Sequence, residues 1–340
     1  MSAVVDQPPV APARGSLLRA ETHRFRSRRF LQVLLGLFVL GWLAAIAIAL
    51  PQFGHPSAGD LSAARAAQQA AVESSNQGRQ QCLDDPSLPT DVPREQFCGQ
   101  PVTAADIPLE QFLADPPFSF AENAEAGALG FAAAAAVLAF LVGATWIGAE
   151  WSTRSIVALL FWRPRRYSVM AAKLTVLAVA AALFGVLAQA AWLAMAGILS
   201  AVAGDGAGVP DGMWGDLLAT QGRAVLLTVL AALGGFGIAN LIRNTGAALG
   251  AGFVYFAVVE TAFRALRPTW QPWLLTNNAV ALINPGGLRL FIDDGQPDQN
   301  GFVQGTEHVI GNLQGGILLA AVTAVLVGVG VVLFARRDLH

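Results

Sequence analysis

Four histidines are the first candidates for catalysis or metal binding, because imidazole is a common general base and metal ligand. They lie far apart in the sequence, at His23, His55, His308 and His340. None begins the H-E-x-x-H pattern, which holds zinc on one face of a helix. Residues 54–59 (GHPSAG) miss the G-x-S-x-G nucleophile pattern by one residue and lack its strand-turn-helix context. We therefore expect no enzymatic activity in this chain, and no bound cofactor or metal ion.

The basic residues exclude nucleotide binding by a P-loop. Lys173 is the only lysine beside 20 arginines, and it lies in the tripeptide Ala-Lys-Leu. A P-loop needs Gly-Lys followed by Ser or Thr, because the lysine reaches the phosphates and the hydroxyl group holds magnesium. The chain therefore has no P-loop with which to hydrolyse ATP.

Two cysteines could form a cross-link or a metal site. Cys82 and Cys98 have fifteen residues between them, which rules out a C-x-x-C redox motif. No histidine or third cysteine lies nearby, which argues against zinc. The orientation derived below places both outside the cytosol, where disulfides persist. We predict a structural disulfide that contributes about 3 kcal/mol in the chain-entropy model.

Glu260 is the one carboxylate within the apolar segments described next, and ionisable groups in a membrane are candidates for function. Arg264 follows one helical turn later. A solvated or ion-paired carboxylate near the end of its helix is therefore favoured over a proton or substrate site.

The composition indicates a membrane protein. Of the residues, 54% are hydrophobic and only 13% are charged, with a mean hydropathy of +0.52, whereas globular chains carry about 25% charged residues. Apolar runs long enough to cross a bilayer as helices occur at 30–50, 127–149, 170–202, 224–242, 245–263 and 315–334. The predicted fold class is an all-α polytopic membrane protein with six transmembrane helices.

Basic residues near the ends of these runs predict the orientation. Fourteen belong to one side, against seven in longer loops on the other. We therefore predict that both termini are cytoplasmic. The preference for arginine over lysine is typical of a GC-rich bacterial genome, which makes a bacterial plasma membrane the expected location. Residues 27–31 also resemble a twin-arginine export signal, but the apolar run that follows is longer than a signal-peptide core and favours a retained helix.

Three segments differ from the apolar runs. Residues 1–29 are a cationic tail in which 16–29 predict either an amphipathic helix on the anionic inner leaflet or a segment that only fixes topology. Within the transmembrane domain at 30–340, residues 51–125 are polar and acidic and predict an extracytoplasmic subdomain, in which residues 61–80 have a helical composition. Residues 264–314 are apolar and broken by Pro and Gly, which predicts either a re-entrant loop at a pore mouth or an interfacial aromatic belt.

The segment between the second and third runs combines an acid, an apolar stretch and a basic turn. It reads GAEWSTRSIVALLFWRPRR from Gly148 to Arg166. Ile156, Leu159 and Leu160 share one face of a predicted helix. Such a face favours a partner groove or the lipid boundary as its neighbour, and a topology-setting loop with an interfacial helix is the alternative.

This segment resembles the motif of type-2 ABC transporter permeases, roughly G-x-E-x-x-x-G-[TS]-[LIM]-x-x-L-L-x-x-P-x-x-R with a lysine a few residues on. The matching residues are Gly148, Glu150, Ser155, Ile156, Leu159, Leu160, Pro164 and Lys173, with Arg165 and Arg166 near the basic position. Residues 18–21 resemble the N-terminal segment of the family, and the stretch LFWRPRR resembles its high-GC Gram-positive branch. Arg154 stands where the family has glycine, which leaves the local turn open, because arginine adopts a positive φ at a higher cost.

The resemblance implies a permease subunit of an exporter. ATP and magnesium would bind a separate ABC ATP-binding subunit, which docks on a coupling helix at 152–162. The interface residues that it implies are Glu150, Arg154, Ile156, Leu159, Leu160, Arg163, Arg165 and Arg166. Such transporters use twelve helices, so a second copy or a paralogue is the further partner, within the lipid membrane and without nucleic acid.

Two other classes of function stay open. A self-sufficient ion-coupled carrier or channel would need charges within the membrane, and Glu260 is the candidate. A membrane-anchored sensor or assembly factor would instead act through the outer loop at 51–125.

Overall fold

The computed structural model describes residues 14–86, 93–162, 165–292 and 305–336. Six helical segments within these ranges are long and apolar enough to cross a membrane, which confirms the six predicted runs. They are Arg29–Gln52, Phe120–Ser152, Arg166–Ala203, Met213–Ile242, Thr245–Leu266 and Asn312–Arg336. Their length and composition indicate a multi-pass membrane protein. The orientation of the termini stays a prediction.

These segments correspond to named elements. The first is α2 (Arg29–Ala49) with the 3₁₀ turn η1 (Leu50–Gln52), and the next three are α5 (Phe120–Ser152), α7 (Arg166–Ala203) and α8 (Met213–Ile242). The fifth joins α9 (Thr245–Val254), the π-helical turn η3 (Tyr255–Val259) and α10 (Glu260–Leu266). The sixth is α12 (Asn312–Arg336), and two shorter helices are α1 (Arg14–Arg26) and α6 (Ser155–Trp162).

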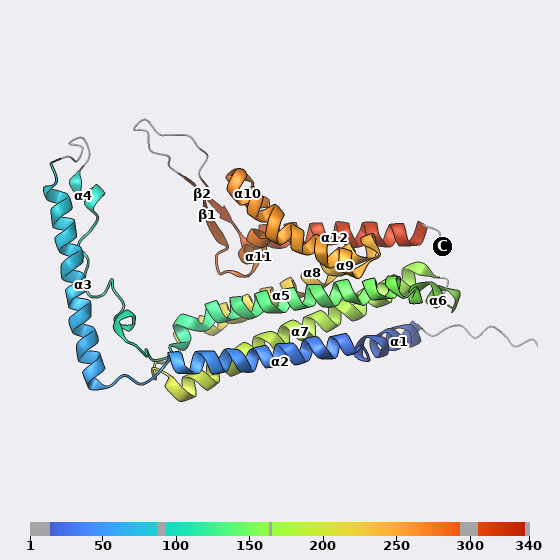
Figure 1. The fold of residues 1–340 in the computed structure, drawn as a ribbon, viewed down its shortest axis with the longest axis horizontal. Helices are drawn as coiled ribbons and strands as arrows, with labels where there is room; N and C mark the ends of the chain where they lie inside the picture. Colours follow the sequence, from blue (N-terminus) through green and yellow to red (C-terminus); the bar gives the residue numbers. More distant parts are fainter. Residues whose placement is uncertain (1–13, 87–92, 163–164, 293–304, 337–340) are drawn as a thin grey trace, which may run out of the picture. The chain divides into compact units, whose positions relative to one another are not determined.

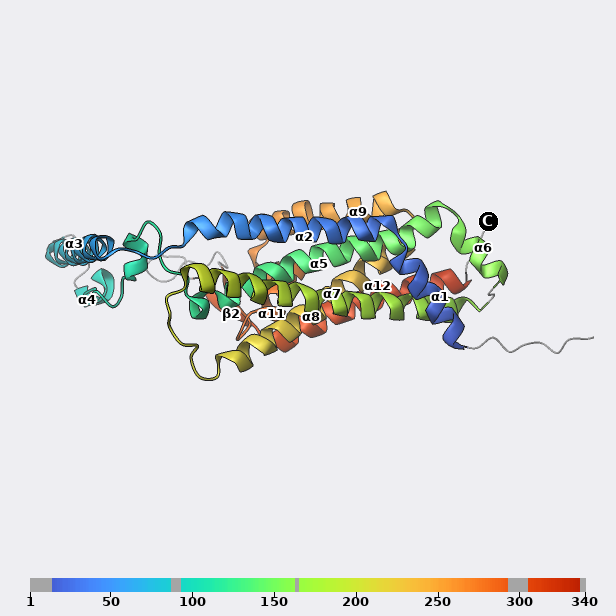
Figure 2. The same cartoon turned by 90° about the horizontal axis from the view of Figure 1, so that it is seen from below.

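The chain divides into two compact units, which we describe separately. The first unit comprises residues 1–39, 124–193 and 211–340, and the second comprises 40–123 and 194–210. In both views, α5, α7, α8 and α12 run side by side within the first unit, and α1 and α6 lie at the same end of it (Figures 1 and 2).

Close backbone contact joins α5 to α8 in the first unit. A Cβ atom added to Gly143 would lie 1.9 Å from the carbonyl oxygen of Ala232, and one added to Gly235 would lie 2.3 Å from that of Phe140. Glycine is therefore needed on both helices. Small residues serve this purpose in membrane bundles, where packing replaces the hydrophobic effect as the main force between helices.

The apolar segment after α10 folds into short elements. These are the 3₁₀ helix η4 (Pro268–Trp273), α11 (Leu275–Ile283) and the antiparallel strands β1 (Leu288–Ile292) and β2 (Thr306–Ile310), with Leu288 opposite Ile310. The all-α prediction lacked this hairpin. Asn312 at the start of α12 donates hydrogen bonds to the carbonyl oxygens of Ala281, Leu282 and Asn284 at the end of α11. Carbonyls without a partner in the helix are thereby satisfied.

The second unit is built on the polar helix α3 (Ala58–Asp84), close to the helical stretch expected from composition. Ser57 and Asp60 form a capping box at its start, and hydrogen bonds from the Ser57 side chain and backbone lower the pKa of Asp60. The disulfide between Cys82 and Cys98 is present, with 5.7 Å between the Cα atoms, so its prediction is confirmed. It joins α3 to the short helix α4 (Arg94–Cys98).

Side chains of α3 also hold the chain that follows α4. Gln68 donates to the carbonyl oxygens of Ala104 and Ile107, and Asn76 exchanges two hydrogen bonds with Val102. Thus amide side chains of a long helix hydrogen-bond to the backbone of an irregular segment. The composition alone shows only that these side chains are polar. The 3₁₀ turn η2 (Leu109–Phe112) completes this part of the unit.

Candidate functional site

Helix α6 follows α5 after a sharp turn at Arg154. The φ angle of Arg154 is 55°, in the left-handed region that favours glycine. The backbone N–H of Arg154 donates to Trp151, and that of Val157 donates to the carbonyl oxygen of Arg154. The turn is therefore formed although arginine replaces glycine, at a cost of roughly 1–2 kcal/mol for a residue with a Cβ atom.

The apolar side chains of α6 divide between two environments. Ile156 is fully buried in the core of the first unit, and Val157 and Leu160 pack partly against that core. Leu159 is half-buried, whereas Phe161 is 85% exposed. The face proposed from the sequence is thus split: Ile156 packs α6 against its own chain, and Phe161 presents a large apolar surface outward.

A buried ion cluster joins α1, α5 and α7 at this end of the unit. The Lys173 ammonium group, with no exposed side-chain surface, lies 2.7 Å from the Glu21 carboxylate and 2.8 Å from the Glu150 carboxylate. Both carboxylates are themselves almost fully buried. The lysine therefore holds together three segments that are more than twenty residues apart in sequence. Removing one partner of such a buried pair leaves an uncompensated charge, which is strongly destabilising.

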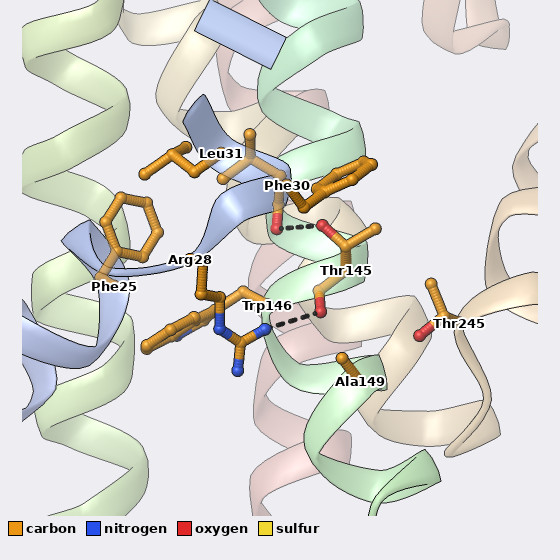
Figure 3. Close-up of a pocket in the computed structure, with 9 residues that line it drawn as sticks. Phe25, Arg28, Phe30, Leu31, Thr145, Trp146, Ala149 and Thr245 are labelled. Carbon is orange, nitrogen blue, oxygen red and sulfur yellow. Dashed lines mark hydrogen bonds between the residues drawn. The ribbon is translucent and has the colours of Figure 1, made fainter. Parts of the chain in front are cut away.

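Arg28 completes the cluster between α1 and α2. It donates one hydrogen bond to Glu150 at 3.2 Å. It donates another to the carbonyl oxygen of Thr145 at 3.1 Å (Figure 3). Burial lowers the pKa of the Arg28 guanidinium, and the carboxylates of Glu150 and Glu21 oppose that shift. Arginine stays protonated in proteins, so Arg28 and Lys173 balance the two buried carboxylates.

Trp146 of α5 lies beside both cations. The Arg28 guanidinium is 4.3 Å and the Lys173 ammonium 4.8 Å from its ring. The Phe25 ring meets Trp146 edge to face at 5.0 Å. Cation–π contacts gain strength when the cation is shielded from water, so Trp146 stabilises the charges that the cluster buries.

A small apolar cavity of about 270 Å³ adjoins the cluster. Its lining includes Phe25, Phe30, Leu31 and Trp146, with the Arg28 guanidinium against its wall (Figure 3). The cavity lies beside the junction of α1 and α2, and the Arg28 guanidinium on its wall is bonded to Glu150 and Thr145.

The far side of the α5 terminus is held by α8. The Trp151 indole N–H donates to the Asn240 side chain at 3.1 Å, and the Arg243 guanidinium lies 4.5 Å from the Trp151 ring. Arg243, like Arg154, has a positive φ angle, of 59°. The base of α6 is thus fixed to α7 and α1 by ions and to α8 by an aromatic contact.

The basic residues after α6 have different surroundings. Arg165 is exposed, and Arg163 lies outside the described residues. Arg166 donates to the carbonyl oxygens of Phe334 and Ala335, each at 3.2 Å, in the last turn of α12. A cation there satisfies carbonyls without a helical partner and complements the helix dipole.

Glu260 occupies a separate buried site. Its carboxylate is 1% exposed, accepts from the backbone N–H of Thr276 at 3.0 Å and pairs with Arg264 at 3.2 Å. Leu274, the residue before α11, provides no side-chain cap, so Glu260 caps α11 from α10. The Glu260 carboxylate is therefore ion-paired, and its role in transport stays untested.

Sequence reasoning singled out Glu150 and Lys173 but missed three members of the cluster: Glu21, Arg28 and Trp146. One signal could have found Glu21: it is the only acid in α1 among several basic residues.

Comparisons with protein-family models, curated proteins and solved structures found no match for the chain.

Proposed function

We propose that the chain is the membrane-spanning permease subunit of an ABC exporter, which couples ATP hydrolysis by a partner subunit to movement of a substrate across the membrane. The six candidate membrane spans, the motif between α5 and α7, and the absence of a P-loop from the sequence support this proposal. The partner ATPase would hold ATP and magnesium, and a second permease subunit would complete the transporter.

The observation that carries the proposal is the exposure of Phe161 on a short helix outside the candidate spans. An 85% exposed phenylalanine favours lipid or a partner surface as its neighbour, because apolar area in water is unfavourable. Arg154 and Arg165, on either side of α6, are also exposed. An apolar tip between two cations suits a groove with an acidic rim on the partner.

The ion cluster gives this helix a mechanical connection to the bundle. Force on α6 would pass through the Arg154 turn to Glu150, and from Glu150 to Lys173 of α7 and Arg28. Glu21 extends the connection to α1. Buried ion pairs restrict the motion of the groups that they join, so these segments would move together when the ATPase subunits close. In this proposal Ile156 packs α6 against the core of the first unit, and Phe161 and Leu159 contact the partner.

A pull-down from native membranes tests the proposal. We expect the wild-type chain, solubilised in detergent, to recover an ATPase of about 30 kDa, the size of one or two domains. Phe161→Arg should abolish recovery without unfolding the chain, because the side chain is exposed. Leu159→Arg should weaken it, and Leu160→Arg is less decisive because Leu160 packs against the core.

Val209→Arg is the matched control, since Val209 is a 39% exposed apolar residue of the second unit. It should leave recovery unchanged. Recovery of no ATPase by the wild-type chain, or equal recovery by wild type and Phe161→Arg, would overturn the proposal.

A further inference from the structure

A large apolar groove of about 620 Å³ lies in the first unit. Residues of α1, α2, α5, α7 and α8 line it, and they are almost all aliphatic or aromatic. Its polar lining residues are Thr22, Arg26 and Thr175. The volume falls within the range of about 300–1,000 Å³ that small-molecule sites occupy.

The polar residues gather at one end. Thr22 follows Glu21, and Thr175 lies two residues after Lys173, to which Glu21 is bonded. From Thr175 the groove follows α7 to Leu187. Twelve helical residues span about 18 Å, close to the roughly 15 Å of half a bilayer core. The groove therefore has the length of one leaflet, with its polar end where headgroups lie.

The groove is open along α7. Val179, Leu183 and Leu187 are 55%, 61% and 60% exposed, and all three line it. In a membrane-spanning helix such surfaces face lipid. A chain could thus enter from the side, along the bilayer, without crossing the bundle.

Charge favours an anionic headgroup at the polar end. Arg26 is exposed, and no acidic residue is among the described residues that line the groove. Arg19, Arg24 and Arg29 add basic charge on or next to α1, while Glu21 is buried against Lys173. Basic clusters immediately beside a membrane span attract anionic lipids.

We propose that this groove binds one anionic phospholipid, with an acyl chain along α7 and the phosphate at Arg26. The lipid would wedge between α1–α2 and α5–α7, and so stabilise α1 against the bundle. This site does not depend on the transport function proposed above. It requires only that the helices span a bilayer.

Native mass spectrometry of the full chain, released from bilayers of equal phosphatidylglycerol and phosphatidylcholine, tests the site. We expect one phosphatidylglycerol to be retained after the other lipids dissociate. Arg26→Gln should lower its retention about fivefold, the contribution of one basic residue near an anionic surface. Arg19→Gln, an exposed arginine of α1 outside the groove lining, is the matched control and should retain more lipid than Arg26→Gln.

A second pair of variants tests the acyl chain. Ala180 lines the groove and Ala190, one of the exposed residues of α7, does not. Ala180→Phe should fill the groove and release the lipid, whereas Ala190→Phe should retain it. Equal retention by both members of either pair would overturn the proposal. A change in oligomeric mass on Ala180→Phe, with lipid retention unchanged, would also overturn it and assign the groove to a second copy of the chain.

Discussion

Glu150 and Glu260 are both buried carboxylates paired with cations in the first unit. They differ in how far along the sequence their cationic partners lie. Glu150 meets a fully buried lysine from α7 and an arginine near α2, so its partners come from distant segments. Glu260 meets Arg264 one turn away, and that arginine is 42% exposed. The first site fixes the relative positions of several helices, whereas the second caps a neighbouring helix. The same residue type therefore has a long-range role only where its partner is buried and distant in sequence.

Of the variants considered, Lys173→Met should cause the largest loss of stability. It leaves Glu21 and Glu150 facing each other without the shared cation, so we expect a loss of about 3–5 kcal/mol in stability. Thermal unfolding in detergent measures this loss. The exposed arginine variant Arg19→Met should unfold at nearly the wild-type temperature, and an equally large effect there would refute the assignment of the loss to burial.

Combining Lys173→Met with Glu150→Met tests whether the two residues belong to one network. The double variant removes one of the two unpaired charges, so we expect it to recover part of the stability that the single variant loses. Additive losses in the two positions would contradict a shared network.

Removing the disulfide measures how much a covalent cross-link contributes to stability. This contribution can be compared with that of the ion cluster. The double variant Cys82→Ser, Cys98→Ser should lower the stability of the second unit by about 3 kcal/mol. Limited proteolysis should then cut within residues 60–115 while the helices of the first unit stay intact. Loss of both units together would show that the second unit is not an independent cooperative body.

Glu260→Gln should have a smaller effect than either. The amide oxygen still accepts from Thr276, and exposed Arg264 regains water, so we expect a loss of roughly 1–2 kcal/mol. Transport should persist in this variant. Abolished transport with a folded protein would favour the ion-coupled carrier instead.

Arg154→Gly should have the smallest effect, and of opposite sign. Glycine adopts φ 55° without a Cβ penalty, so we expect a gain of up to about 1 kcal/mol. Arg243→Gly is the matched comparison, because it relieves a similar φ but loses the contact with Trp151. Its net change should be close to zero, and an equal gain in both variants would contradict a stabilising role for that contact.

The sequence predicted those features that depend on local pattern. The six apolar runs and the helical character of α3 follow from composition and periodicity, and the disulfide from spacing and predicted compartment. The π-helical turn η3 and the β1–β2 hairpin have no comparable signal. Their conformation depends on tertiary contacts, and periodicity does not record those.

The candidate site was predictable only in part, for the same reason. Glu150 and Lys173 were singled out by a motif, but Glu21 joins them through a contact across 152 residues. The burial of Ile156 and the exposure of Phe161 also depend on how α6 turns at Arg154. Helical spacing placed Ile156, Leu159 and Leu160 on one face, but it does not say which neighbours that face meets.

Site-specific photo-crosslinking from position 161 in native membranes tests whether α6 docks on an ATPase subunit. A photoreactive phenylalanine analogue there conserves the exposed aromatic side chain of α6. We expect a cross-linked product with a protein that carries a P-loop, and none from the same analogue at position 209. A product with any protein that lacks a P-loop, or with lipid alone, would contradict it.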